Sequence, residues 1–244
     1  MSTPRKLWLL LIFSAAHLPI HFADAQETNP GDGPASTLLF SDSFKSAPAA
    51  SWFWIREHKG AWRVGDQGLE VLIEPGNMWG PQNDARNVLL RPAPLPGTNA
   101  IQIEVMFEHA PTNQYEQADL VWYFDDSNMV KVGEELVDGK LSVVMGREEN
   151  DQTRTISITP LISRKVHLRM DVSVHGITGW FQVPGGERWT RVGQCELPRS
   201  PEAGAKPKVG LQFYQGVAGS GHWARVTEFR MFNSQTAASV KQQK

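Results

Sequence analysis

The stretch from residue 115 to residue 147 reads YEQADLVWYFDDSNMVKVGEELVDGKLSVVMGR. Its apolar runs have the length of β-strands, and the acidic turn sequence DDSN at residues 125–128 separates the first run from the second. The second and third runs flank the pair Asp138-Gly139. An Asp-Gly pair between strand patterns is a strong β-hairpin signal, because both residues tolerate the positive φ angles of a tight turn. The stretch therefore predicts β-strands joined by short turns.

The segments on either side alternate apolar and polar side chains. In residues 99–109 (NAIQIEVMFEH) and residues 164–174 (RKVHLRMDVSV), the alternation continues over most of the segment. A period of two is typical of a half-buried strand in an antiparallel sheet, since successive side chains point to opposite faces. Shorter strand patterns occur at residues 68–74, 87–91 and 208–214, each bounded by turn-forming residues.

These patterns predict an all-β fold. No segment after residue 25 keeps apolar residues at helical spacing over a dozen positions, so we expect almost no helix. Many short strands with regular turn signals are typical of a sandwich or barrel. A two-sheet core with exposed edges suits the antiparallel jelly-roll sandwich. We expect this single domain to span residues 37–232.

The N-terminus has the features of a secretory signal peptide. Arg5 and Lys6 supply the positive charge, residues 7–16 form an apolar run, and Ala23-Asp24-Ala25 matches a small-x-small cleavage site. The alternative is a retained membrane anchor, but the run is shorter than the roughly 20 apolar residues that a spanning helix needs. We expect a signal peptide over residues 1–25, export to the periplasm or the medium, and no membrane association of the mature form.

The segments next to the predicted domain lack strand patterns. Residues 26–36 (QETNPGDGPAS) are polar and rich in turn formers, which predicts a flexible linker. Residues 233–244 (NSQTAASVKQQK) have no apolar period and predict a disordered tail.

Charge and cysteine content exclude several classes of function. The formal charge of the chain is −2, and removing the +1 of residues 1–25 leaves −3. Such a balance gives no electrostatic reason to expect nucleic acid or an anionic membrane as a partner. The single cysteine, Cys195, cannot form an intramolecular disulfide or a zinc site with several thiolates, and we expect it to be a small buried hydrophobic residue. We expect no cofactor.

The stretch quoted first resembles the core signature of concanavalin A-like domains found at the C-terminus of beta-xylosidases, and of a related stand-alone family of unknown function. Residues 116–120 (EQADL) match a Glu-Gln-Ala-Gly-Leu pattern, and Lys131, Gly133 and Glu135 match Lys-x-Gly-x-Glu ahead of the Asp138-Gly139 hairpin. One position departs from the family pattern, since Asp119 stands where a glycine is usual. A carboxylate there needs a partner or changes what that face binds.

The resemblance extends over most of the chain, through residues 52–57, Trp62, residues 87–91, 166–169 and 208–211. It implies a concanavalin A-like sandwich with one concave face and an association with polysaccharide-degrading systems. It does not imply catalysis, because the attached propeller performs the chemistry in beta-xylosidases.

Sugar recognition needs aromatic faces for the apolar side of pyranose rings and a few fixed polar groups for the hydroxyls. Lys131 and Glu135 share one face of a strand, and the alternative to a sugar-binding floor is an ordinary ion pair on an outer sheet face. Most tryptophans are expected in the core, whereas Trp79 lies in a loop sequence. The candidate binding residues are Gln117, Lys131 and Glu135 as polar contacts, Trp79 and Trp122 as stacking surfaces, and Asn87 and Arg91 from the first half of the chain.

The function predicted is that of a secreted, non-catalytic, carbohydrate-binding module with an oligo- or polysaccharide partner. One alternative is a glycoside hydrolase or sugar lyase with Glu135 as acid or base, paired across the hairpin with Asp119 or Glu116. No carboxylate motif of the jelly-roll glucanases is present, and the adjacent Glu134 and Glu135 would point to opposite faces of a strand. Another alternative is a structural domain of the cell envelope. The DDSN sequence at residues 125–128 is explained better as a turn than as a calcium loop.

Overall fold

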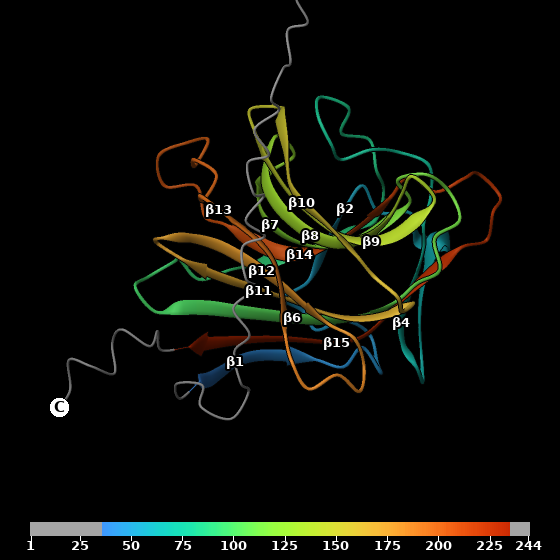
Figure 1. Ribbon diagram of the computed structural model, residues 1–244, viewed down its shortest axis with the longest axis horizontal. Coiled ribbons are helices and arrows are strands. Elements are labelled where there is room, and N and C mark those ends of the chain that lie inside the picture. The colour runs from blue at the N-terminus through green and yellow to red at the C-terminus, as the bar shows by residue number, and fades with distance from the viewer. Residues whose placement is uncertain (1–35, 235–244) are drawn as a thin grey trace, which may run out of the picture.

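The computed structural model describes residues 36–234 of the chain (Figure 1). Within these residues, fifteen strands form two sheets in which all recorded strand pairs are antiparallel, and one short 3-10 turn, Lys59–Ala61, is the helical element. The predicted all-β, two-sheet sandwich of the jelly-roll type is confirmed. None of the helical structure in the described residues is long and apolar enough to cross a membrane.

One sheet has eight strands and is the flatter layer in Figure 1. Its strands run in the order β13 (Thr190–Cys195), β12 (Gly176–Gln182), β11 (Lys165–Ser173), β6 (Ala100–Glu108), β15 (Trp223–Ser234), β4 (Gly68–Leu72) and β3 (Trp62–Gly65), and β1 (Ser36–Asp42) also pairs with β15.

The other sheet has seven strands and curves strongly, so that its hollow faces away from the eight-stranded sheet (Figure 1). Its strands run in the order β10 (Gln152–Pro160), β9 (Lys140–Glu149), β8 (Asn128–Val137), β7 (Gln117–Asp125), β14 (Lys208–Tyr214), β5 (Val88–Pro92) and β2 (Phe53–Ile55). The stretch quoted at the outset thus forms three neighbouring strands, β7, β8 and β9.

The main core lies between the two sheets and follows the predicted alternation. Ile101, Ile103, Val105 and Phe107 of β6 are buried in it, and the alternate residues of β11 face them from the neighbouring strand. Burying a large apolar side chain of this kind contributes roughly 1.5–3 kcal/mol. Cys195 belongs to the same core, as expected, and burial raises the pKa of its thiol to about 11.

A second, smaller apolar cluster lies on the hollow side of the seven-stranded sheet. There the segment between β4 and β5, residues 73–87, crosses the sheet and buries Met78 and Ala85 against Val121 and Tyr123 of β7. This segment covers part of the hollow and leaves another part open, which determines where a ligand can reach the sheet.

Both turns predicted in the stretch from residue 115 to residue 147 are present in the structure. In the turn at residues 125–128, Asp125 Oδ1 accepts hydrogen bonds from the Ser127 N–H at 2.9 Å and from Asn128 Nδ2 at 2.8 Å, an arrangement typical of an acidic turn. Asp138 and Gly139 both have positive φ, as the hairpin requires.

The predicted strand patterns did not include β1, β2, β3, β10, β12, β13 or β15. In β15, a register shift between Val226 and Glu228 interrupts the alternation. This strand continues to Ser234, two residues into the predicted tail, and Ser36 of β1 pairs with that last residue. The predicted signal peptide (1–25), the linker before Ser36 and the rest of the tail lie outside the described residues.

Candidate functional site

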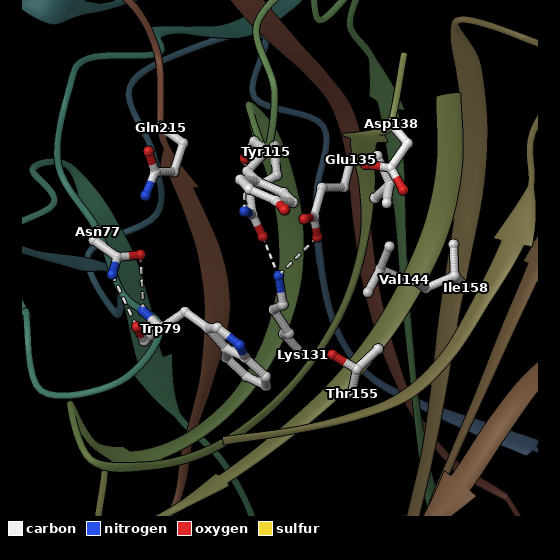
Figure 2. A pocket seen from close by; sticks show the side chains of 12 residues that line it. Asn77, Trp79, Tyr115, Lys131, Glu135, Asp138, Val144, Thr155, Ile158 and Gln215 are labelled. Atoms are coloured by element: carbon white, nitrogen blue, oxygen red, sulfur yellow. Dashed lines mark hydrogen bonds and ion pairs between the residues drawn. The ribbon is translucent and has the colours of Figure 1, made fainter. Parts of the chain in front are cut away.

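A pocket of about 480 Å³ opens in the uncovered part of the hollow (Figure 2). This volume lies within the range of small-molecule sites, which is roughly 300–1,000 Å³. Strands β7 to β10, three loops and the β8–β9 turn contribute to its walls, so segments far apart in the chain meet here. Its lining consists of Asn77, Trp79, Tyr115, Gln117, Lys131, Glu135, Val137, Asp138, Val144, Thr155, Ile158 and Gln215.

The floor of the pocket brings together the three predicted polar residues. Gln117 of β7 is directly opposite Glu135 of β8, and Lys131 lies on the same face of β8 as Glu135. The Lys131 ammonium donates a hydrogen bond to Gln117 Oε1 and lies 3.1 Å from Glu135 Oε2. Only 3% of Lys131 is exposed, so this group is held in one place by its neighbours.

Beneath the floor lies Asp119, the residue that departs from the family pattern. It pairs with Gly133 across β7 and β8, and a Cβ atom added at Gly133 would fall 1.7 Å from Asp119 Oδ1. The glycine therefore makes room for this carboxylate. Gln212 Nε2 of β14 donates to Asp119 Oδ2 at 3.0 Å, and Lys131 Nζ lies 3.9 Å from the same oxygen. Burial raises the pKa of Asp119 to about 6, although the charge of Lys131 opposes that shift.

Lys131 is charged despite its burial. Burial by itself would lower the pKa of the ammonium, but the negative charges of Asp119 and Glu135 outweigh that effect and raise its pKa above the usual value. The indole of Trp79 lies beside it, with the ring centroid 5.1 Å from Lys131 Nζ.

Trp79 lies on the loop between β4 and β5, as predicted, and forms one wall of the pocket (Figure 2). The ring packs against the backbone of β9, since a Cβ at Gly146 would come within 2.5 Å of the indole. Asn77 holds the loop from within: its Oδ1 accepts from the Trp79 N–H at 3.1 Å, and its Nδ2 donates to the Trp79 carbonyl at 2.8 Å. A platform clamped in this way loses little further freedom when a ligand binds.

Among the residues of the site that the sequence analysis missed, Glu148 and Tyr115 have the most distinctive surroundings. Glu148 of β9 is fully buried under the Trp79 loop, and its carboxylate oxygens accept the Gly80 N–H at 3.2 Å. Burial raises the pKa of Glu148 to about 7. Tyr115 is 49% exposed and has a positive φ, and it stands over the floor next to Gln117, whose Nε2 donates to the Tyr115 carbonyl at 2.7 Å. Its place directly before the EQADL motif was the available signal.

Trp122 is a correction, because it offers no stacking surface. Its side chain is fully buried in the core between the sheets, together with Ala118 and Leu120 of the same strand. Gln117 and Trp122 are an odd number of positions apart, so a strand directs them to opposite faces.

Asn87 and Arg91 do not line the pocket, and their side chains contact other residues of the sandwich. Asn87 has a φ of 55°, and its Oδ1 accepts the His58 N–H at 2.7 Å. The Arg91 guanidinium lies over the ring of Phe40, 3.2 Å from its centroid, and burial lowers the pKa of Arg91 to about 10. Neither arrangement leaves these groups directed at a ligand in the hollow.

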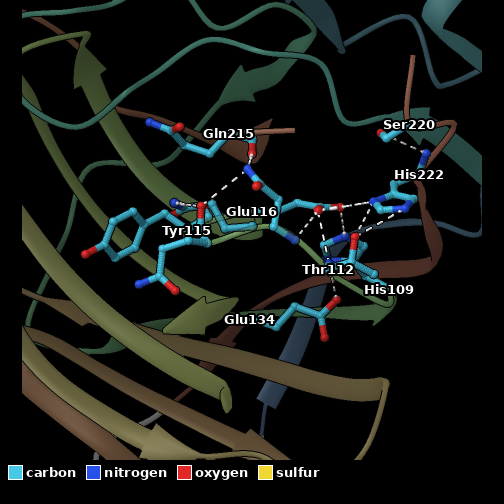
Figure 3. A network of polar contacts seen from close by, with 11 residues as sticks. His109, Thr112, Tyr115, Glu116, Glu134, Gln215, Ser220 and His222 are labelled. Carbon is cyan, nitrogen blue, oxygen red and sulfur yellow. Dashed lines mark hydrogen bonds and ion pairs between the residues drawn. The ribbon is translucent and has the colours of Figure 1, made fainter. Parts of the chain in front are cut away.

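A second polar cluster lies next to the pocket, on the far side of Tyr115 and Gln215 (Figure 3). His109 is buried between two carboxylates, with Nε2 3.1 Å from Glu116 Oε1 and Nδ1 3.0 Å from Glu134 Oε1. His222, on the loop after β14, lies 3.0 Å from the same Glu116 oxygen.

Hydrogen bonds within this cluster favour the charged forms of His109 and Glu116, whereas burial raises the pKa of Glu134. Burial would lower the pKa of His109, but the hydrogen bonds to Glu116 and Glu134 raise it. Burial would likewise raise the pKa of Glu116, yet His109, His222 and two backbone N–H groups lower it to about 2. The described residues contain no group of three or more His, Cys, Asp or Glu arranged to hold a metal ion.

This cluster connects two loops at the rim of the pocket. Glu116 Oε2 accepts the N–H groups of Thr112 and Asn113 at 3.1 Å, and Asn113 Nδ2 donates to the Gln215 carbonyl at 3.0 Å. Of the two carboxylates predicted as catalytic partners of Glu135, Glu116 is held by this cluster and Asp119 by Gln212. Asp119 and Glu116 are fully buried, which leaves neither of them open to a substrate.

Comparisons with known proteins support the fold. No family profile and no curated protein matches this sequence. Among solved structures, the GH43 BlXynB protein from Bacillus licheniformis matches with a TM-score of 0.69 at 17% identity, over 79% of this chain and 39% of that one. The xylan beta-1,4-xylosidase from Bacillus halodurans C-125 matches with a TM-score of 0.67 at 16% identity, over 78% of this chain and 38% of that one.

A shorter protein is also similar. A functionally unknown protein from Saccharomyces cerevisiae matches with a TM-score of 0.53 at 15% identity, and the alignment covers 77% of this chain and 95% of that one. The chain thus corresponds to about two fifths of the Bacillus proteins and to nearly all of the yeast protein. These likenesses agree with the sandwich that the sequence resemblance implied, and at such identities they concern the fold alone.

Proposed function

We propose that this protein binds carbohydrate without covalent chemistry, in the pocket of the seven-stranded sheet. The observation that carries the proposal is the clamped, partly exposed indole of Trp79 beside a fixed polar floor of Gln117, Lys131 and Glu135. An aromatic face beside buried, pre-oriented hydrogen-bonding groups is the combination that sugar recognition requires. Tyr115, on the rim, adds a second aromatic surface.

The similarity of this fold to solved structures supports the same proposal. Two of the similar structures are named as a GH43 protein and a xylan beta-1,4-xylosidase, which makes a plant-type or algal polysaccharide fragment the ligand of choice. An exported protein would meet such polysaccharides directly, which fits the signal peptide predicted for residues 1–25. We assign no catalytic step, because Glu135 is engaged by Lys131 and the carboxylates predicted to assist it are buried.

The test is a glycan array followed by calorimetric titration of the best oligosaccharide. Trp79→Ala is expected to weaken binding at least tenfold, because it removes the stacking surface. Trp189→Ala is the matched control, since this tryptophan packs against His167 of the eight-stranded sheet, outside the pocket. The control is expected to bind like the wild type.

Two outcomes would overturn the proposal. The absence of binding to any glycan would favour a structural role in the cell envelope. Release of reducing ends from a bound oligosaccharide, lost in Glu135→Gln while binding persists, would favour a glycosidase, and appearance of an unsaturated sugar would favour a lyase.

A further inference from the structure

The pocket has an unusual balance of charge. Among the described residues that line it, Lys131 is the one basic side chain, whereas Glu135 and Asp138 are acidic. Two more carboxylates, Asp119 and Glu148, are fully buried directly beneath the floor and under the Trp79 loop. The pocket and the layer beneath it therefore contain four carboxylates and a single ammonium group.

That ammonium is already paired with negative charge. Its partners are Gln117 Oε1 and the carboxylates of Glu135 at 3.1 Å and Asp119 at 3.9 Å. A carboxylate or sulfate on a ligand would have to displace Glu135 from Lys131 and would then lie close to the displaced charge. Two like charges at such distances inside a partly desolvated pocket repel each other far more strongly than they would in water.

Asp119 contributes to this balance without touching the ligand. It is fully buried, its Oδ2 accepts from Gln212, and its Oδ1 has no hydrogen-bond partner among the described residues. The space it fills exists because position 133 is a glycine. With the glycine that the resembling family usually has at position 119, Lys131 would keep Glu135 as its single carboxylate partner and would attract anions more strongly.

We infer that the pocket accepts uncharged glycans and rejects those that carry carboxylate or sulfate groups, and that Asp119 acts as a specificity-determining residue by neutralising Lys131. This inference rests on the proposed function and adds the class of sugar. It gives Asp119, which departs from the family pattern, a role in selectivity as well as in packing.

The experiment compares matched neutral and anionic polysaccharides at pH 8, where Asp119 is ionised. The probes are xylan and glucuronoxylan, galactan and polygalacturonan, and agarose and carrageenan. In the pair that binds, the affinity of the wild type for the neutral polysaccharide is expected to be at least tenfold higher than its affinity for the anionic one. In Asp119→Asn the anionic member is expected to gain about tenfold in affinity while the neutral member stays within about twofold, since the amide keeps the size of the side chain.

Asp66→Asn is the matched control, because it removes the same charge from an exposed turn of the eight-stranded sheet. It is expected to leave the ratio of the two affinities unchanged. If Asp119→Asn does not fold, the wild type still provides a test: raising the salt concentration from 20 to 500 mM is expected to reduce its preference, because salt screens the repulsion.

The outcomes separate this inference from the proposed function. Equal or tighter binding of the anionic polysaccharide by the wild type overturns the inference and leaves the carbohydrate site in place. An unchanged affinity ratio in folded Asp119→Asn overturns the role of Asp119. If no member of any pair binds, the proposed function fails together with the inference.

Discussion

The two buried polar clusters of this protein are built from similar groups and differ in their access to solvent. In the Lys131 cluster, one cation lies among Glu135, Asp119 and Gln117, and the cluster forms the floor of an open pocket. In the His109 cluster, one imidazole lies between Glu116 and Glu134, and all three side chains are buried away from the pocket.

This difference shows how buried charge serves two purposes within one sandwich. A closed cluster whose members pair with one another holds the loops at the pocket rim, because breaking any pair would leave a charge without compensation. An open cluster presents polar groups in fixed positions next to an aromatic wall, which suits ligand recognition. Four substitutions test this division, and their expected effects decrease in the order given.

The largest effect is expected where the closed cluster loses its central histidine. His109→Ala leaves Glu116 and Glu134 buried without the imidazole between them, and we expect unfolding free energy to fall by about 3–5 kcal/mol. Chemical denaturation measures this loss. His58→Ala removes an ion pair of a half-exposed histidine with Glu74 and is expected to cost less than about 1 kcal/mol. Similar costs for the two variants would show that the closed cluster is no stronger than a surface pair.

A smaller effect is expected beneath the open cluster. Gly133→Ala places a methyl group where Asp119 Oδ1 lies, and such overpacking costs about 1–3 kcal/mol. Combining it with Asp119→Gly should recover part of the loss, because the methyl group then occupies the space that the carboxylate left. A double-mutant cycle in denaturant measures the coupling, and simple additivity would contradict the packing argument.

The pH dependence of stability is expected to reveal Glu148. Its pKa is raised from 4.5 to about 7 in the folded protein, so between these pH values the native state binds more protons than the unfolded chain. Stability attributable to Glu148 therefore falls as the pH rises through this window. Glu148→Gln should flatten that part of the curve relative to the wild type. Parallel curves for both proteins would show that Glu148 does not titrate there.

The smallest effect is expected at the rim. Tyr115→Ala removes a half-exposed ring that lines the pocket and packs little, so we expect glycan affinity to drop about threefold while unfolding is unchanged. Calorimetric titration and thermal unfolding measure the two quantities separately. A loss of stability comparable to that of His109→Ala would instead assign Tyr115 to the closed cluster.

Much of the fold was predictable because the alternation of apolar and polar residues that marks a strand is a local feature of the sequence. The alternation in residues 99–109 and 164–174 and the Asp138-Gly139 turn correspond to β6, β11 and the β8–β9 hairpin within one residue. Seven strands were missed, among them β15, whose register shift breaks the period of two.

The candidate site was predictable in part, for the same reason. Gln117, Lys131 and Glu135 came together because strand parity and the family motif both placed them on one face. Trp122 was assigned to that face against the parity of its own strand, and the structure places it in the core. Asn87 and Arg91 had no comparable constraint, and both serve the packing of the sandwich.

The sequence by itself determined the all-β class, the central strands and the polar floor, because side-chain direction along a strand depends on backbone geometry that neighbouring residues already specify. Only the tertiary structure decided that Trp79 is clamped over Gly146 by Glu148, that Gln215 joins the rim, and that Asp119 neutralises Lys131. These contacts join residues that are far apart in the sequence or lie on different strands, and their distances follow from sheet curvature and loop packing, which no local pattern encodes.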